Sequence, residues 1–295
     1  MNYPIWEITT IGGGSLVALI AILHVYISHL AVGGGLFIWL TDLKGVREKN
    51  PQILEYVHKH TWFFLLLTMV FGGLSGVGIW FIIALVNPAA TSSLIHNFVF
   101  GWAIEWVFFV GEIAALLVYY YKFYQLKEKD RLNMAFLYFL FAWLSLVIIN
   151  GILTYMLTPG KWLETQYFWH GFFNPTYFSS LFFRSFASFM IAGLFAYVTI
   201  VFLKEGEFRQ NMMRYATRWL LFPVIGMIPS AIWYYYAIPA DIRTTAFVLN
   251  PQTSPFVTIL ITATVLIFLI GLLLARKSSV ATQRGLTFIL VIIGL

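Results

Sequence analysis

Long apolar segments alternate with short polar ones along the whole chain. Each apolar segment has about 20 or more residues, which at a rise of about 1.5 Å per residue is enough for a helix to cross a hydrocarbon core about 30 Å thick. The seven segments occupy residues 14–41, 61–87, 95–121, 133–157, 178–203, 215–238 and 255–275. The pattern therefore predicts an all-α fold, a polytopic transmembrane helix bundle.

An eighth apolar segment begins near residue 285 and is interrupted by the end of the sequence at Leu295. A helix of about 11 residues does not cross a bilayer, and the last five residues, VIIGL, contain neither a cap nor a charge. We therefore expect at least eight helices and a natural chain that continues beyond Leu295. No repeat or soluble segment divides the sequence, so a single transmembrane bundle is expected over residues 1–295.

The basic residues are distributed unevenly between the loops. Of the 18 lysines and arginines, 15 fall in or beside the loops that follow the first, third, fifth and seventh apolar segments. They are Lys44, Arg47, Lys49, Lys59, Lys122, Lys127, Lys129, Arg131, Lys204, Arg209, Arg214, Arg218, Arg276, Lys277 and Arg284. By the positive-inside rule these loops face the cytoplasm and the N-terminus faces outward.

This topology also accounts for the formal charge of +6, so no nucleic-acid partner is expected. The composition agrees with a membrane protein, since 60% of the residues are hydrophobic, 10% are charged and the mean hydropathy is +0.83. The expected location is the inner membrane of a prokaryote, with the lipid bilayer as a partner. The chain has no cysteine, which excludes covalent c-type haem, thiolate-bound iron–sulfur clusters and disulfides within the chain.

Five ionisable side chains lie inside the predicted membrane helices: His24, His29, Glu105, Glu112 and Arg184. Ionisable groups are costly in hydrocarbon, so each one marks a candidate site. A single group of this kind is explained equally well by a polar neighbour on the next helix. Five of them at related depths favour a shared function.

The spacing of these residues limits what they can do together. Glu105 and Glu112 are seven residues apart, which places both on one face of a helix. His24 and His29 are five apart, about 140° around the helix axis, so they cannot easily bind one ion, and the i, i+4 zinc spacing is absent. Paired carboxylates in line along a helix suit proton transfer to a buried redox centre.

A histidine in an aromatic-rich bundle suits axial ligation of haem iron. We interpret His24 as an iron ligand, and His29 as a second ligand to another haem or metal, or as a partner of a carboxylate such as Glu112. Gly33 opens a run of three glycines that removes side chains beside these positions. Close helix packing and the approach of a flat macrocycle both explain that run, and the sequence leaves both open.

Five sequence motifs carry a resemblance to a known family. They are HVYISHLAVGGGLFIWLTDL at 24–43, MVFGGLSGVGIWF at 69–81, FGWAIEWVFFVGE at 100–112, LVIINGILTYMLTPG at 146–160 and NPTYFSSLFFRSFASFMIAGLFA at 174–196. In this order they resemble the first five helices of subunit I of the cytochrome bd oxidase family, over roughly residues 10–200. The second part of the bundle, about residues 213–295, resembles that family less.

The resemblance implies that His24 is an axial ligand in the pair of haems at the oxygen-reducing site, with Glu105 and Glu112 near it. It also implies haem b as a cofactor and a second homologous membrane subunit as a partner. Several features depart from the family, among them the absence of a methionine ligand in the seventh apolar segment, His29 at a position where the family usually has proline, and a spacing between Glu105 and Glu112 that is one residue shorter. Arg184 stands where the family has the histidine ligand of its low-spin haem, and the external quinol-binding loop after the sixth helix is reduced to about 16 residues, 239–254.

The leading hypothesis is a haem-b-bearing membrane subunit of a bd-like respiratory complex. It would pass electrons between a quinone pool or an external c-type cytochrome and its haems, with oxygen as a candidate acceptor and a second haem type as a candidate cofactor. Arg184 has no lone pair to offer iron, so we expect it to pair with haem propionates. The alternatives are a haem-free, quinone-binding anchor of an oxidoreductase and a proton-coupled transporter, although paired broken helices of the transporter kind are absent.

The remaining histidines lie near the ends of the predicted spans. His58 and His60 fall at the cytoplasmic edge, and His96 and His170 at the outer edge. We expect all four to be solvated interfacial side chains. The outer two lie where a partner cytochrome would dock.

Overall fold

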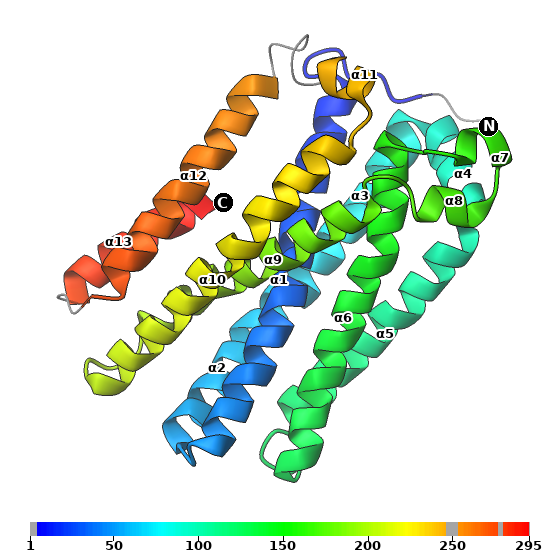
Figure 1. Ribbon diagram of the computed structural model, residues 1–295. Coiled ribbons are helices and arrows are strands. Elements are labelled where there is room, and N and C mark those ends of the chain that lie inside the picture. The colour runs from blue at the N-terminus through cyan, green and yellow to red at the C-terminus, as the bar shows by residue number, and fades with distance from the viewer. Residues whose placement is uncertain (1–4, 246–252, 277–279, 295) are drawn as a thin grey trace.

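The computed structural model describes residues 5–245, 253–276 and 280–294, and this part of the chain is built from helices without a strand (Figure 1). In chain order the helices are α1 (Gly13–Arg47), α2 (Pro51–Leu66), the π-helix η1 (Leu67–Gly72), α3 (Gly73–Val86), α4 (Pro88–Asn97), α5 (Val99–Tyr121), α6 (Glu128–Leu157), α7 (Trp162–Thr165), α8 (Phe168–Phe172), α9 (Tyr177–Ile200), α10 (Glu207–Ala237), α11 (Ala240–Arg243), α12 (Thr253–Leu274) and α13 (Val280–Gly294).

Seven helical segments are long and apolar enough to cross a membrane, and they match the seven apolar segments of the sequence. The second of them is a continuous span in which α2, η1 and α3 follow one another over Pro51–Val86. The predicted eighth segment forms α13, which begins five residues before the expected position. Its 15 residues extend about 22 Å, so α13 is shorter than a full crossing.

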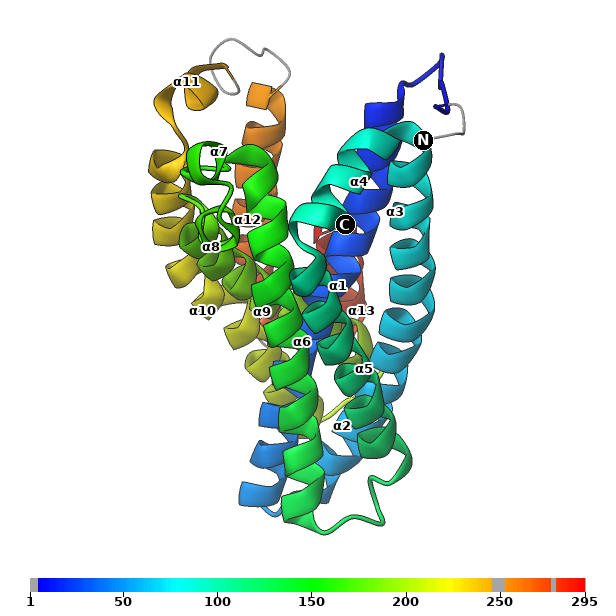
Figure 2. The same cartoon turned by 90° about the vertical axis from the view of Figure 1, so that its right-hand side faces the viewer.

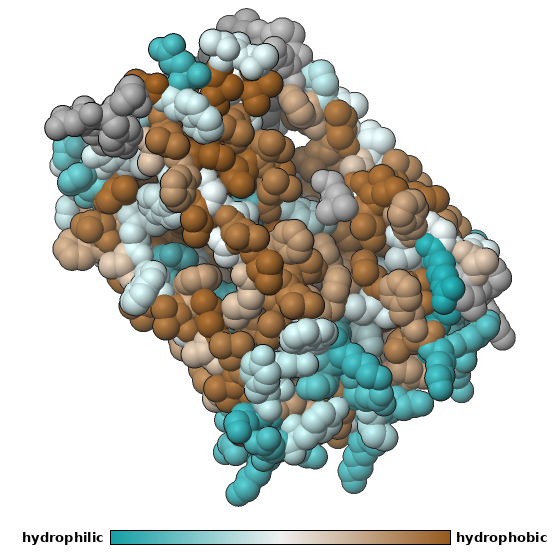
Figure 3. All heavy atoms as spheres, turned by 180° about the vertical axis from the view of Figure 1, so that it is seen from behind, coloured by the Kyte–Doolittle hydropathy of each residue, from teal (hydrophilic) through white to brown (hydrophobic). Residues whose placement is uncertain are grey.

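The loops divide between the two ends of the bundle (Figures 1 and 2). The loops after α1, α5 and α9 lie at one end, which we call the basic end because it holds residues such as Lys49, Lys122 and Lys204. The short helices α4, α7, α8 and α11 lie at the opposite end. On the face seen in Figure 3, apolar side chains cover the middle, and hydrophilic ones gather mostly towards the basic end, with a few at the opposite end. The predicted grouping is confirmed for the three loops after α1, α5 and α9, whereas Lys277 of the fourth basic loop lies outside the described residues. The cytoplasmic orientation of the basic loops stays a prediction.

Helix α1 packs against three neighbours through its run of three glycines. A Cβ atom at Gly33 would lie 1.8 Å from the carbonyl oxygen of Ser188 in α9. A Cβ at Gly34 would lie 2.3 Å from the Phe64 ring in α2, and one at Gly35 would lie 2.6 Å from the Tyr138 ring in α6. At all three positions the space beside α1 is therefore filled by helices, as the packing interpretation of the glycines requires.

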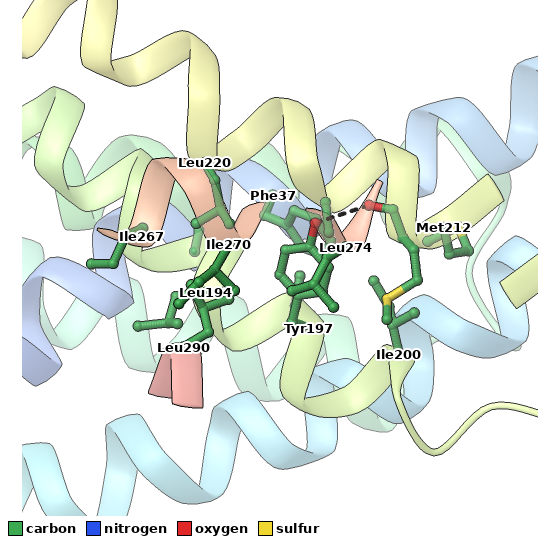
Figure 4. Packing of buried hydrophobic residues seen from close by; sticks show 14 of the residues in the cluster. Phe37, Leu194, Tyr197, Ile200, Met212, Leu220, Ile267, Ile270, Leu274 and Leu290 are labelled. Atoms are coloured by element: carbon green, nitrogen blue, oxygen red, sulfur yellow. Dashed lines mark hydrogen bonds between the residues drawn. The ribbon is translucent and has the colours of Figure 1, made fainter. Parts of the chain in front are cut away.

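Buried apolar side chains join α9 and α10 to the C-terminal helices (Figure 4). Tyr197 of α9 and Leu220 of α10 meet Ile270 of α12 and Leu290 of α13, and all four are less than a tenth exposed. The Tyr197 hydroxyl lies 3.3 Å from the Met213 carbonyl oxygen, to which it donates a hydrogen bond, so its polar end also has a partner. These contacts make α12 and α13 part of the same bundle.

Candidate functional site

The two carboxylates of α5 face the same neighbouring helix, α6. Ser145 Oγ donates a hydrogen bond to Glu105 Oε1 over 2.7 Å. The Tyr138 hydroxyl lies 3.2 Å from Glu112 Oε1 and 3.3 Å from the main-chain oxygen of Ala31 in α1. The prediction that Glu105 and Glu112 share one face of α5 is thus confirmed. Their partners on α6 are also seven residues apart, so the antiparallel helices α5 and α6 keep one register along their contact, which we call the α5–α6 seam.

The same seam continues to a buried ion pair near the basic end. Arg131 of α6 donates two hydrogen bonds to Asp42 of α1, from Nε to Oδ2 over 2.9 Å and from Nη2 to Oδ1 over 2.8 Å. The hydroxyl of Tyr119, seven residues after Glu112 on α5, donates to Asp42 Oδ2 over 3.0 Å. The Phe123 ring covers the guanidinium at 4.6 Å. Both oxygens of a fully buried carboxylate are therefore satisfied.

His24 faces α3. Its Nδ1 lies 3.1 Å from Ser75 Oγ, and its Nε2 lies 3.3 Å from Ser28 Oγ. Each serine hydroxyl also donates its one hydrogen to a main-chain oxygen four residues earlier, that of His24 or Phe71. With those bonds in place the serines can only accept from the ring. A neutral imidazole has one N–H, so its other nitrogen keeps a lone pair without a donor.

His29 is buried on a different side of α1. Its Nδ1 lies 2.6 Å from the main-chain oxygen of Val25, to which it can only donate, and the ring lies within electrostatic range of Arg184. That bond fixes the tautomer and turns the Nε2 lone pair away from Val25. Histidines that ligate metals are held in the same manner, by donation from the other ring nitrogen. The two histidines thus face different helices, as their spacing predicts.

Arg184 ends a short polar chain on α9. Its Nε donates to Ser180 Oγ over 3.2 Å, and that hydroxyl donates to Asn150 Oδ1 of α6 over 2.8 Å. A guanidinium has five N–H donors, and in the part of the chain that the structure describes no carboxylate forms an ion pair with it. Arg184 is thus a cation within the bundle that can still bind an anion.

The five predicted residues therefore lie at three places in the bundle rather than at one centre. The carboxylates lie on the seam between α5 and α6, whereas His29 and Arg184 lie between α1 and α9, and His24 lies between α1 and α3. Within residues 5–245, 253–276 and 280–294 no three histidine or acidic side chains converge as ligands of a metal ion. Axial ligation of haem needs only one or two side chains. Gly33, the remaining predicted cofactor residue, contacts α9.

The four remaining histidines differ in their exposure to solvent. His96 and His170 are exposed, as predicted. The prediction for His60 is wrong, because its ring is 2% exposed and its Nδ1 lies 2.8 Å from Thr199 Oγ1. Helix α2 begins at Pro51, ten residues before the apolar segment, so His60 lies within the packed bundle rather than at its edge. His58 is half-buried, with its ring stacked on Tyr120 at 4.9 Å.

Sequence reasoning missed the cluster of Asp42, Arg131 and Tyr119. In the sequence Asp42 directly follows the first apolar segment, and Arg131 is one of the basic residues beside the loop after the third segment. A signal existed in the seven-residue spacing from Glu112 to Tyr119, which continues the face of the two glutamates.

Comparison with known proteins supports the fold. No family model matches the chain, and no curated protein matches its sequence. Among solved structures, a chain of the bd oxidase from Geobacillus thermodenitrificans is similar, with a TM-score of 0.77 and 13% sequence identity over 96% of this chain and 82% of that chain. At this identity the likeness concerns the fold alone. It extends beyond the motifs at 10–200 to almost the whole chain, which is a multi-pass, helical membrane protein with a bd oxidase-like fold.

Proposed function

We propose that this protein is a haem-b-bearing membrane subunit of a bd-like respiratory oxidoreductase. The observation that carries the proposal is the environment of His29 and Arg184 in the bundle. A buried imidazole with its Nδ1 engaged lies within electrostatic range of a guanidinium that forms no ion pair with any acidic side chain the structure describes. This combination suits a cofactor that has both a metal centre and acidic groups, and the bd oxidase-like fold supports the same interpretation.

The residues present fit haem in their chemistry. His24 and His29 each keep one nitrogen lone pair that an iron can accept, and they face different helices, so they would hold separate cofactors. Arg184 would pair with propionate groups, because guanidinium binds carboxylates through paired N–H donors. A haem at either histidine supplies one-electron transfer at its iron. The run at Gly33 contributes helix packing rather than a cradle.

The two carboxylates on the α5–α6 seam, Glu105 and Glu112, would hold and pass protons. The Tyr138 hydroxyl has one hydrogen but lies within reach of two acceptors, the Ala31 oxygen and Glu112 Oε1. Both contacts are satisfied at once only when Glu112 carries a proton and donates it to the tyrosine oxygen. Glu112 thus alternates between accepting from Tyr138 and donating to it, and Glu105 continues the path along the same helix face.

The partners follow from this proposal. Electrons would come from a quinone pool or an external c-type cytochrome, and oxygen is the candidate acceptor. A second homologous membrane subunit would complete the complex, and a second haem type is a further candidate cofactor. The orientation with the basic end in the cytoplasm of a prokaryotic cell would place the short outer helices where an external cytochrome docks.

A visible spectrum of the purified protein tests the proposal directly. We expect haem b bands, and we expect His24→Ala and His29→Ala each to lower the haem-to-protein ratio in a pyridine haemochrome assay. His58→Ala is the matched control, because its ring stacks on an interfacial tyrosine and should leave the ratio unchanged. Wild-type protein without haem would refute the proposal and favour the haem-free quinone-binding anchor or the proton-coupled transporter.

A second pair of variants tests the role of Arg184. Arg184→Lys keeps the positive charge, whereas Arg184→Ala removes it. We expect the lysine variant to retain more haem than the alanine variant, because charge rather than ligation is the proposed contribution. Equal loss of haem in both variants would contradict the pairing with propionates.

A further inference from the structure

A groove of about 250 Å³ opens on the surface of the bundle between α9 and α10. Four of its six lining residues are aromatic, Phe186 and Phe189 from α9 and Trp219 and Phe222 from α10. Phe222 is 64% exposed, and the groove belongs to the apolar surface rather than to a loop. The occupant must therefore be a molecule that approaches from the hydrocarbon phase.

Helices α9 and α10 are closely packed beside the groove. Gly193 lets α9 approach the backbone of α10, since a Cβ there would lie 2.8 Å from the carbonyl carbon of Trp219. Gly226 admits the ring of Phe186 in the same manner, at 2.3 Å from an added Cβ. Pro223 also lines the groove and fixes the backbone of α10 there. The groove is thus bordered by tightly packed helix surfaces.

One end of the groove is cationic. Arg218 lines it, and Arg214 lies one helical turn closer to the basic end, with both side chains exposed. No acidic side chain among residues 5–245, 253–276 and 280–294 forms an ion pair with either. In the direction away from the basic end the same face continues with exposed Phe222 and Ile225. The positive charge of Arg218 next to the aromatic wall is complementary to an anionic head group joined to an apolar chain.

We propose that this groove binds an anionic phospholipid of the leaflet at the basic end. Its phosphate would lie at Arg218, with Arg214 as a second cation, and a segment of one acyl chain would lie between the aromatic rings. The volume favours this occupant, because pockets that enclose a small-molecule substrate are typically about 300–1,000 Å³, and this groove is smaller and open to the bilayer. The proposal is independent of haem.

The test is native mass spectrometry of the purified protein, titrated with phosphatidylglycerol or with phosphatidylcholine of the same chain length. We expect the anionic lipid to bind more tightly. Arg218→Ala should lower its affinity about fivefold, whereas Arg218→Lys should retain most of it. Phe222→Ala should weaken binding of both lipids.

Two matched controls separate a built site from general surface properties. Lys122→Ala removes an exposed cation from the same end of the bundle, and Phe202→Ala removes a 75% exposed aromatic ring outside the groove. Neither should change lipid affinity. Equal binding of the two lipids, or equal effects of Arg218→Ala and Lys122→Ala, would overturn the proposal. So would a short-chain quinone that binds in an Arg218-dependent manner while the anionic lipid does not.

Discussion

Replacing Gly33 by alanine tests the packing of α1 in its most demanding contact. The added Cβ would lie 1.8 Å from a main-chain oxygen of α9, that of Ser188. Ordinary van der Waals contact begins near 3.4 Å, so the two helices would have to separate by about 1.6 Å. A backbone oxygen cannot rotate away as a side chain can. We therefore expect a cost near the upper end of the range for overpacked cores, about 3 kcal/mol.

Thermal unfolding of the detergent-solubilised protein, followed by tryptophan fluorescence, measures this cost. A loss of about 3 kcal/mol corresponds to a midpoint lower by roughly 5–10 °C for a chain of this size. Gly73→Ala is the matched control, because a Cβ there meets nothing within 4 Å. It should unfold at or slightly above the wild-type temperature, since alanine favours a helix by about 1 kcal/mol over glycine.

The Gly34→Ala variant should fall between Gly33→Ala and Gly73→Ala in its cost to stability. Its added Cβ would meet the ring of Phe64 at 2.3 Å, and a ring can move where a main-chain oxygen cannot. We expect an intermediate midpoint. If Gly33→Ala unfolds at the same temperature as Gly73→Ala, the close contact of α1 with α9 does not exist in the membrane protein.

Two further predictions concern the basic end. Asp42→Ala should lower the free energy of unfolding by about 3–5 kcal/mol in the same assay, because it leaves Arg131 buried without its counter-ion. Glu48→Ala removes a partly exposed ion pair and should cost about 1 kcal/mol or less. Equal costs of the two substitutions would refute the distinction between the buried and the exposed pair. A cysteine at Gln125 should resist impermeant thiol reagents in intact cells while one at Gln166 is labelled, and the reverse pattern would invert the topology.

The transmembrane architecture was predictable because hydrocarbon imposes length and composition on every span. All seven apolar segments became helices of sufficient length, and three of the basic loops came together at one end. The shared face of Glu105 and Glu112 was predictable for a similar reason, since a seven-residue spacing fixes direction within one helix. These features depend on local periodicity alone.

Contacts between distant segments were not predictable in the same manner. The partner of Asp42 lies 89 residues away in the sequence, and that of His60 lies 139 residues away. No periodicity within one helix encodes which face meets which neighbour. The glycine run illustrates the limit, because the sequence allowed either a macrocycle or a helix beside Gly33, and only the position of α9 decides.

The common register of α5 and α6 has a consequence for biogenesis. A lone α5 would carry two carboxylates into the bilayer, and one charged group at the centre of a helix costs about 3 kcal/mol on insertion scales. Ser145 and Tyr138 of α6 supply the hydrogen bonds that lower this cost. Only residues 122–127 separate the two helices. We therefore expect the translocon to release α5 and α6 together as a helical hairpin, so that a chain ending before residue 128 leaves α5 poorly inserted.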